Sequence, residues 1–388
     1  MPKNIVICCD GTGNEFGHEN SNVVKLYQTL ICDADQIAYY HPGVGTMGAR
    51  NALTQIGKWW TRTIGLAFGY GISENVADAY QFLMRNFEPE DRIYVFGFSR
   101  GSYTARALCG MLHAVGLLTP GNEALIPYAI RMIKGRGIDF AILADFKRTF
   151  SRECKVHFIG VWDTVSSVGW VYNAVQFPYT ATNPDIAIVR HAVSIDERRA
   201  FFRQNLFVDR HSNQDLLEVW FAGVHSDVGG SYPESESQLS KLSLRWMLCE
   251  AELVGLAVEP KRKRDVLGAT QPYVPPDPTG PMHNSLYGLW WLAEIWPKMV
   301  RVREPGAKNE WRSTVRLNLG RPRNIPKGSS VHRSVEERVK LVGSYRPTNL
   351  GQLHFDFRIV DDRCRDQLGS ENVEQDIQGS VELQRKDP

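Results

Sequence analysis

An apolar segment that leads into a glycine-flanked serine constrains the fold more than any other part of this sequence. Residues 93–98 read IYVFGF and are followed directly by Ser99. Gly97 and Gly101 stand two positions before and after the serine. The β-branched and aromatic residues favour a buried strand, and residues 103–108 favour a helix. The pattern therefore predicts a strand, a tight turn at Ser99 and a helix.

The two glycines of this G-x-S-x-G pattern have a steric explanation. In so tight a turn, a side chain at Gly97 or Gly101 would collide with neighbouring backbone. The serine itself must take a strained backbone conformation that lifts its Oγ away from the sheet. α/β-Hydrolases carry their nucleophile in this setting. An ordinary turn serine stays open as the alternative interpretation of Ser99.

Strands and helical segments alternate along the first 250 residues. Apolar runs predict further strands at 4–9, 37–40, 156–161 and 219–222. Helical spacing of apolar residues appears between these runs, at 23–31, 76–87 and 239–253. This alternation predicts an α/β protein with the α/β-hydrolase fold, in which a mostly parallel central sheet has helices on both faces. A C-terminal extension of helices and loops is expected after this core.

Residues capable of chemistry follow four of the expected strands, namely Asp10, Ser99, Asp163 and His225. Ligands of parallel sheets bind beyond the carboxyl ends of the strands. If these strands run parallel, the four side chains meet at one edge of the sheet. The sequence therefore predicts a site at that edge.

Ser99, Asp163 and His225 stand in the chain order that α/β-hydrolases use for nucleophile, acid and base. Serine needs a base to take its proton, and the base needs an acid that fixes its tautomer. We predict that these three residues form a catalytic triad. Asp196 and Asp227 stay open as the acid, and Asp227 has a second interpretation as a residue that orders the His225 turn through backbone hydrogen bonds.

The negative charge of a tetrahedral intermediate needs N–H donors that are already in place. The backbone N–H of Arg100 is expected to be one donor, because it follows the nucleophile. Gly11 and Thr12, in the loop after the first strand, are the expected second source, with a plain glycine turn as the alternative. The residues expected to support the site without reacting are Asp10, Gly97, Gly101 and Asp227.

Five segments together resemble the DUF2235 family of α/β-hydrolases, which includes type VI secretion phospholipase effectors. These segments are CDGTGN at 9–14, GVGT at 43–46, GFSRGSYTAR at 97–106, GVWDTV at 160–165 and WFAGVHSDVGG at 220–230. The resemblance implies Ser99 as nucleophile, His225 as base, Asp163 as the best match for the acid, and hydrolysis of phospholipid esters. The chain is short and has no obvious large membrane-docking module, so a smaller acyl ester stays open as the substrate.

The expected function is hydrolysis of carboxylic esters, with lipids or phospholipids as substrates, through an acyl-enzyme and without a metal or organic cofactor. A metal-dependent phosphohydrolase is one alternative, because Asp10 begins a D-G-T sequence similar to that of aspartate-nucleophile phosphatases. Cys8 stands where the first aspartate of that pattern belongs. The other alternative is a hydrolase scaffold that binds a partner without catalysis.

Composition limits the partners and the compartment. The net charge of the 388 residues is only +2, so no overall field attracts nucleic acid. No apolar stretch approaches the roughly 20 residues of a membrane span, which leaves peripheral membrane contact open. No secretory signal is visible, so we expect a cytoplasmic protein, with signal-independent export still open. The seven cysteines, an odd number, are expected to be free thiols. The oligomeric state is not predicted.

Three regions are expected along the chain. Residues 1–260 form the catalytic core, residues 261–350 an extension that acts as a lid or cap, and residues 351–388 a partly ordered tail. The stretch 286–299 is rich in tryptophan and leucine at helical spacing. It predicts an amphipathic helix that either packs on the core or serves as a lid or acyl-binding surface.

Overall fold

The structure is a computed structural model. It describes residues 2–11, 17, 19–43, 70–134, 137–165, 177–208, 211–288, 290–295, 298–303, 311–351 and 356–364. The predicted oxyanion donor Thr12 lies outside the described residues, as does most of the predicted tail. No helix within the described ranges has the length and apolar character needed to cross a bilayer.

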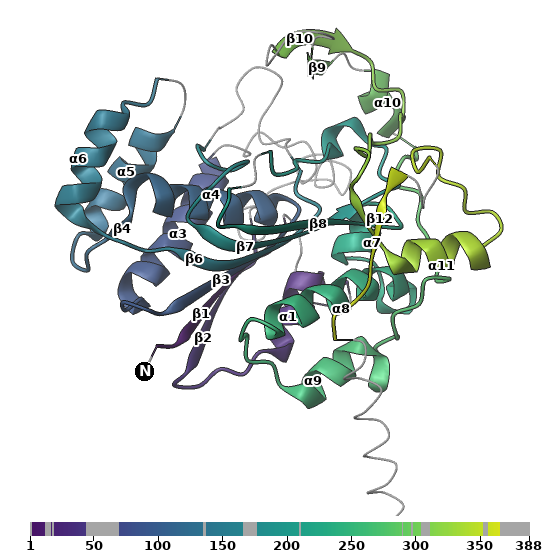
Figure 1. Cartoon of the computed structure of the whole chain (residues 1–388), viewed down its shortest axis with the longest axis horizontal. Coiled ribbons are helices and arrows are strands. Elements are labelled where there is room, and N and C mark those ends of the chain that lie inside the picture. Colours follow the sequence, from purple (N-terminus) through teal and green to yellow (C-terminus); the bar gives the residue numbers. More distant parts are fainter. Residues whose placement is uncertain are drawn as a thin grey trace, which may run out of the picture.

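A parallel sheet of eight strands forms the centre of the molecule (Figure 1). Its strand order is β12-β11-β8-β7-β6-β3-β1-β2, and each neighbouring pair is parallel. The strands are β1 (Asn4–Cys9), β2 (Gln36–His41), β3 (Arg92–Phe98), β6 (Val156–Trp162), β7 (Ile186–Ser194), β8 (Asp215–Phe221), β11 (Ser330–His332) and β12 (Arg358–Val360). The predicted fold class, a mostly parallel sheet with helices on both faces, is confirmed.

Alternate residues of the central strands bury against different helices. Ile93 and Val95 of β3 belong to one apolar core together with α3 (Tyr70–Asn86) and α4 (Arg100–Val115). Tyr94 and Phe96 belong to a second core together with α1 (Asn22–Thr29) and α8 (Gln238–Glu252). Successive side chains of a strand point to opposite faces, so a strand buried on both faces is apolar throughout. This explains the continuous apolar run before Ser99.

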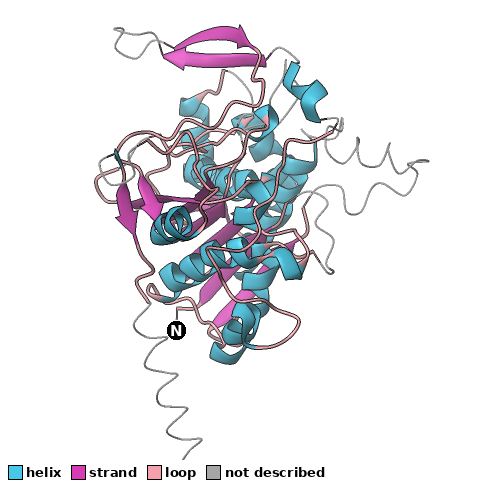
Figure 2. Ribbon diagram, turned by 90° about the vertical axis from the view of Figure 1, so that its right-hand side faces the viewer, coloured by secondary structure: helices cyan, strands magenta, loops and turns pink. Residues whose placement is uncertain are grey.

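Shorter elements surround this sheet (Figure 2). The strands β9 (Lys298–Arg303) and β10 (Trp311–Arg316) form a separate antiparallel pair, as do β4 (Leu117–Leu118) and β5 (Ser151–Arg152). The remaining helices within the described ranges are η1 (Glu123–Leu125), α5 (Ile126–Ile133), α6 (Phe140–Phe150), η2 (Ala200–Phe202), α7 (His225–Gly229), η3 (Glu234–Glu236), α9 (Pro260–Arg264), η4 (Asp265–Ala269), α10 (Trp290–Ile295) and α11 (Arg333–Leu341).

The stretch 286–299 does not form the single helix that its apolar spacing predicts. Among the described residues of this stretch, the helix α10 covers Trp290–Ile295, and Met299 belongs to β9. Gly288 has a φ of 55°, which a right-handed helix cannot include. The backbone at Gly288 and the start of β9 therefore limit the helix, despite the apolar periodicity of the stretch.

The C-terminal region contributes to the central sheet itself. β11 pairs with β8, and β12 pairs with β11, so strands from beyond residue 260 extend the sheet of the expected core. Val331 and Val335 share an apolar core with Trp220. The central sheet therefore crosses the expected boundary at residue 260.

The cysteine prediction needs one correction. Cys249 of α8 and Cys364 form a disulfide across 115 residues of sequence. The other cysteines are free thiols, as predicted; Cys32 is exposed, whereas Cys8, Cys9, Cys109 and Cys154 are buried. The pairing was not visible in the sequence because the two partners have no characteristic spacing.

Candidate active site

The turn from β3 to α4 has the geometry that the G-x-S-x-G pattern predicts. Ser99 has φ 58° and ψ −119°, a conformation that is costly for a residue with a side chain. A Cβ on Gly97 would lie 2.6 Å from the carbonyl oxygen of Gly101. A Cβ on Gly101 would lie 2.1 Å from the carbonyl oxygen of Cys9. Both glycines are therefore sterically required, as predicted.

A second serine attaches this turn to the neighbouring strand. Ser102 Oγ lies 2.7 Å from the carbonyl oxygen of Gly97 and 2.8 Å from that of Trp162, the last residue of β6. The backbone N–H of Ser99 donates to the same Trp162 carbonyl at 3.1 Å. These bonds hold the strained turn against the strand that leads to Asp163.

Asp163 and His225 form a buried hydrogen-bonded pair. Asp163 follows β6, and His225 is the first residue of α7, shortly after β8. Nδ1 of His225 lies 2.5 Å from Oδ2 of Asp163. Nε2 of His225 is buried and has no hydrogen-bond partner among the described residues. The imidazole is therefore fixed at one nitrogen and available at the other.

The imidazole also lies beside the serine turn. Phe98, the residue before Ser99, stacks its ring on His225 with 4.7 Å between ring centroids. A Cβ on Gly229 would lie 1.9 Å from the Phe98 ring, so α7 itself packs tightly against this residue. The fold thus brings Asp163 and His225 into contact and holds Ser99 next to a ring that touches the imidazole.

The charges around His225 favour a neutral imidazole that is hydrogen-bonded to an ionised Asp163. Burial works against the charge of Asp163, but Arg323 and the hydrogen bond from His225 outweigh it and hold the pKa of Asp163 well below its usual range. Burial lowers the pKa of His225, although Asp163 opposes this. An ionised Asp163 accepts a hydrogen bond from the N–H at Nδ1 of His225, so the proton stays on Nδ1 and a lone pair is left on Nε2.

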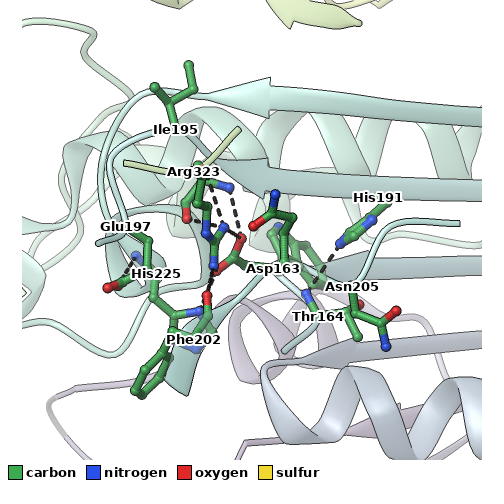
Figure 3. A network of polar contacts seen from close by, with 12 residues as sticks. Asp163, Thr164, His191, Ile195, Glu197, Phe202, Asn205, His225 and Arg323 are labelled. Carbon is green, nitrogen blue, oxygen red and sulfur yellow. Dashed lines mark hydrogen bonds and ion pairs between the residues drawn. The ribbon is translucent and has the colours of Figure 1, made fainter. Parts of the chain in front are cut away.

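Arg323 holds the acid with both ends of its guanidinium (Figure 3). Nη1 donates to Oδ1 of Asp163 at 2.5 Å, and Nη2 donates to Oδ2 at 3.0 Å. Nη1 also donates to Ser194 Oγ at 2.7 Å, and Nη2 to the carbonyl of Phe202. Sequence reasoning missed this role, because Arg323 lies 160 residues after Asp163 in a loop without a motif.

A second carboxylate, Glu197, lies on the backbone side of the histidine. Its Oε2 accepts the backbone N–H of His225 at 3.3 Å, and its Oε1 accepts the hydroxyl of Ser285 at 2.9 Å. Burial opposes the charge of Glu197, but the neighbouring Arg199 and other cations lower its pKa to about 2. Two carboxylates, each paired with an arginine, therefore flank His225.

The two alternative acids form no hydrogen bond with the imidazole of His225. Asp227 Oδ2 accepts the backbone N–H of Val224 at 3.0 Å, so it orders the turn that carries His225, as its second interpretation predicts. Its other oxygen lies 2.6 Å from Nδ1 of His283. Asp196 accepts the N–H of Gly223 at 2.7 Å, and burial raises its pKa to about 6. Of the three acids considered, Asp163 is the one bonded to the His225 ring.

The loop after β1 borders the serine turn but uses Gly11 differently from expectation. The N–H of Gly11 donates to Oδ1 of Asp10 at 2.6 Å, so this donor is already engaged. Oδ2 of the buried Asp10 accepts the hydroxyls of Ser21 at 2.7 Å and Tyr40 at 2.8 Å. The Gly11 N–H is therefore paired with Asp10 in this structure, its role as an oxyanion donor stays a prediction, and the contacts of Asp10 organise this loop.

Arg100 is the first residue of α4, directly after Ser99. The first N–H groups of a helix have no carbonyl partner within that helix. The N–H of Arg100 is thus of the type that binds a developing negative charge at a helix N-terminus.

One group of described side chains has the ligand types of a metal site, namely His332, Asp361 and Asp362, whose ligand atoms lie within 4.8 Å of one another. Asp362 forms an ion pair with Arg245 at 2.8 Å, and Asp361 forms one with Arg333 at 2.5 Å. Because arginines already neutralise both carboxylates, this cluster is an ion-pair network at the ends of β11 and β12.

A parallel sheet with a serine at a strained strand-to-helix turn is the arrangement that places the nucleophile in α/β-hydrolases. The sequence model for the catalytic domain of Tle1-like phospholipase effectors of the type VI secretion system matches residues 3–250. The chain therefore belongs to this family, which confirms the resemblance found in its motifs. Residues 3–250 correspond to the catalytic domain of that family model.

The individual proteins that are similar to this chain have low sequence identity to it. The uncharacterized protein YEL023C of Saccharomyces cerevisiae is 26% identical in an alignment that is 554 positions long, gaps included, and that covers 90% of this chain and 80% of that protein. A crystal structure of an uncharacterized protein from Pseudomonas aeruginosa is 18% identical with a TM-score of 0.42, covering 71% of this chain and 49% of that one.

A structure of the Tle1 effector bound to the VgrG spike from the type 6 secretion system is also similar. It is 21% identical to this chain with a TM-score of 0.31, covering 61% of this chain and 52% of that one. This chain spans about half the length of these two solved chains.

Proposed function

We propose that this protein hydrolyses the carboxylic esters of phospholipids through an acyl-enzyme on Ser99. The observation that carries the proposal is the buried His225, bonded at Nδ1 to Asp163 and, among the described residues, unpartnered at Nε2, beside the turn that presents Ser99. Membership of a phospholipase effector family supports the choice of substrate.

The steps follow from these positions. Ser99 Oγ attacks the acyl carbon and forms a bond to it, while Nε2 of His225 takes the hydroxyl proton. The resulting imidazolium is stabilised by Asp163, and it gives the proton to the departing alcohol oxygen as the ester bond breaks. Water then attacks the acyl-enzyme with His225 again acting as base, which releases the fatty acid and restores Ser99.

The oxyanion needs donors that point to it before the reaction. The N–H of Arg100 is the proposed first donor, and Thr12 stays the proposed second. Each such donor stabilises the transition state by roughly 3 kcal/mol. Arg323 keeps Asp163 ionised and oriented throughout, so the acid does not need to move during turnover.

The direct test replaces the nucleophile. Ser99→Ala is expected to lower the hydrolysis of phosphatidylcholine vesicles and of p-nitrophenyl butyrate by a factor on the order of 10⁶ in kcat, since removal of the nucleophile disables the whole triad. Ser235→Ala, which changes an exposed serine, serves as the matched control and is expected to retain activity. Undiminished hydrolysis by a folded Ser99→Ala protein would refute the mechanism.

A further inference from the structure

Arg199 is a rigidly held arginine beside the proposed catalytic base. Its Nε donates to Oε1 of Glu197 at 3.0 Å, and its Nη2 donates to Oε2 at 2.9 Å. This two-point contact fixes one edge of the planar guanidinium. The Glu197 side chain is fully buried, so the anchor belongs to the protein interior.

Two aromatic rings hold the face of the same guanidinium. Cζ of Arg199 lies 3.6 Å from the ring centroid of Phe202 and 4.9 Å from that of Trp290. Phe202 in turn contacts the His225 imidazole edge-on, with 4.8 Å between centroids. Arg199 is thus one ring away from the proposed base, and its charge contributes to the lowering of the His225 pKa.

The remaining nitrogen of Arg199 is not used within the described part of the protein. Nη1 has no hydrogen-bond partner among the described residues, although the other two nitrogens are both engaged. The side chain is 12% exposed, so the guanidinium is not sealed inside the protein. The contact with Glu197 uses Nε and Nη2, so the outer edge at Nη1 is available to another acceptor.

We propose that Arg199 binds the phosphodiester group of the phospholipid substrate through this outer edge. Guanidinium groups donate to phosphate oxygens in a fixed fork, and a pre-positioned one loses little conformational freedom on binding. The phosphodiester is separated from the scissile ester by only the glycerol backbone. When the scissile ester lies at Ser99 and His225, the negatively charged phosphodiester of a phospholipid therefore lies within reach of Arg199. A neutral acylglycerol has no such charge. This inference rests on the proposed function.

The test compares two substrates with the same acyl chains, soluble dihexanoyl phosphatidylcholine and dihexanoylglycerol. Arg199→Gln is expected to lower the ratio of their kcat/KM values by roughly 10–100-fold, because only the phospholipid loses a charge-assisted hydrogen bond. Arg199→Lys, which keeps the charge without the fork, should give a smaller loss of the ratio. Arg148→Gln removes an exposed arginine on α6 and should leave the ratio at the wild-type value.

A binding measurement separates this inference from the proposed reaction. Glycerophosphocholine, which is the phospholipid without its acyl chains, should bind Ser99→Ala about tenfold or more tightly than Ser99→Ala/Arg199→Gln in calorimetry, the size expected for one charge-assisted hydrogen bond. Equal binding, or an equal loss of kcat/KM for both esters, would show that Arg199 only supports Glu197 and would overturn the inference. If the wild type cleaves neither ester, the proposed function fails, and the titration still decides whether Arg199 binds phosphodiesters.

Discussion

At the scale of single residues, the candidate site depends on the ionisation of one buried acid. Burial raises the pKa of Asp163 and so favours its neutral form, and a neutral acid does not fix the tautomer of His225 in the useful form. Arg323 supplies the compensating charge from a distant part of the chain. The same logic holds on the other side of His225, where Arg199 compensates Glu197.

The substitution Asp163→Asn tests whether the site depends on an ionised acid at position 163. The amide of asparagine donates to Nδ1 of His225, which leaves the proton on Nε2 and prevents that nitrogen from acting as a base. We expect kcat for ester hydrolysis to fall on the order of 10⁴-fold, the size known for this change in a serine protease. Asp145→Asn, at an exposed position, is the control. Retention of more than about a tenth of the activity would contradict the role of Asp163.

At the scale of elements, the loop that carries Arg323 belongs functionally with the strands of the proposed catalytic centre. It lies shortly before β11, which itself pairs with β8, the strand that leads to His225. The acid follows β6, and the base follows β8. Elements far apart in sequence thus converge at one edge of the sheet, as expected for parallel strands.

Arg323→Met should change the pH profile as well as the rate. Loss of the positive charge raises the pKa of Asp163, and it also favours the protonated form of His225. Both effects act in the same direction, so the acid limb of kcat/KM should move to higher pH, by roughly 1–3 units. Arg323→Lys should shift the limb less. The measurement is kcat/KM for p-nitrophenyl butyrate across the range from about pH 4 to about pH 9.

A matched control separates this effect from simple destabilisation. Arg190 is another buried arginine, paired with Glu250 at 2.5 Å and Asp215 at 2.5 Å. Arg190→Met should lower the unfolding temperature but leave the acid limb where it is in the wild type. A limb that stays in place in Arg323→Met, or that moves equally in Arg190→Met, would contradict the role given to Arg323.

Local rules made part of the site predictable from sequence. The serine turn followed from the glycines at 97 and 101, because its steric demand falls on residues adjacent in the chain. Arg323 could not be found in this way, because its contact with Asp163 is created only by folding. The hydrogen bond from the Gly11 N–H to Asp10 could not be found either, because it depends on the conformation of the folded loop.

At the scale of the whole molecule, the sheet continues past the region that carries the family motifs. The family match ends at residue 250, whereas β11 and β12 add to the same sheet and their residues share a core with β8. The disulfide Cys249–Cys364 joins α8 to the segment after β12. The strand alternation predicted the α/β class, but three-residue strands at 330 and 358 are too short to leave a periodic signal.

The proposed mechanism stands on one condition, that folding unites Ser99, Asp163 and His225 into a single nucleophilic centre. Treating the full chain with a fluorophosphonate and locating the adduct by peptide mass spectrometry tests this condition. We predict one adduct, on Ser99, in the wild type, and loss of that adduct in His225→Ala. An adduct on another residue, or an unlabelled Ser99 in an active wild-type protein, would show that the three residues do not act together.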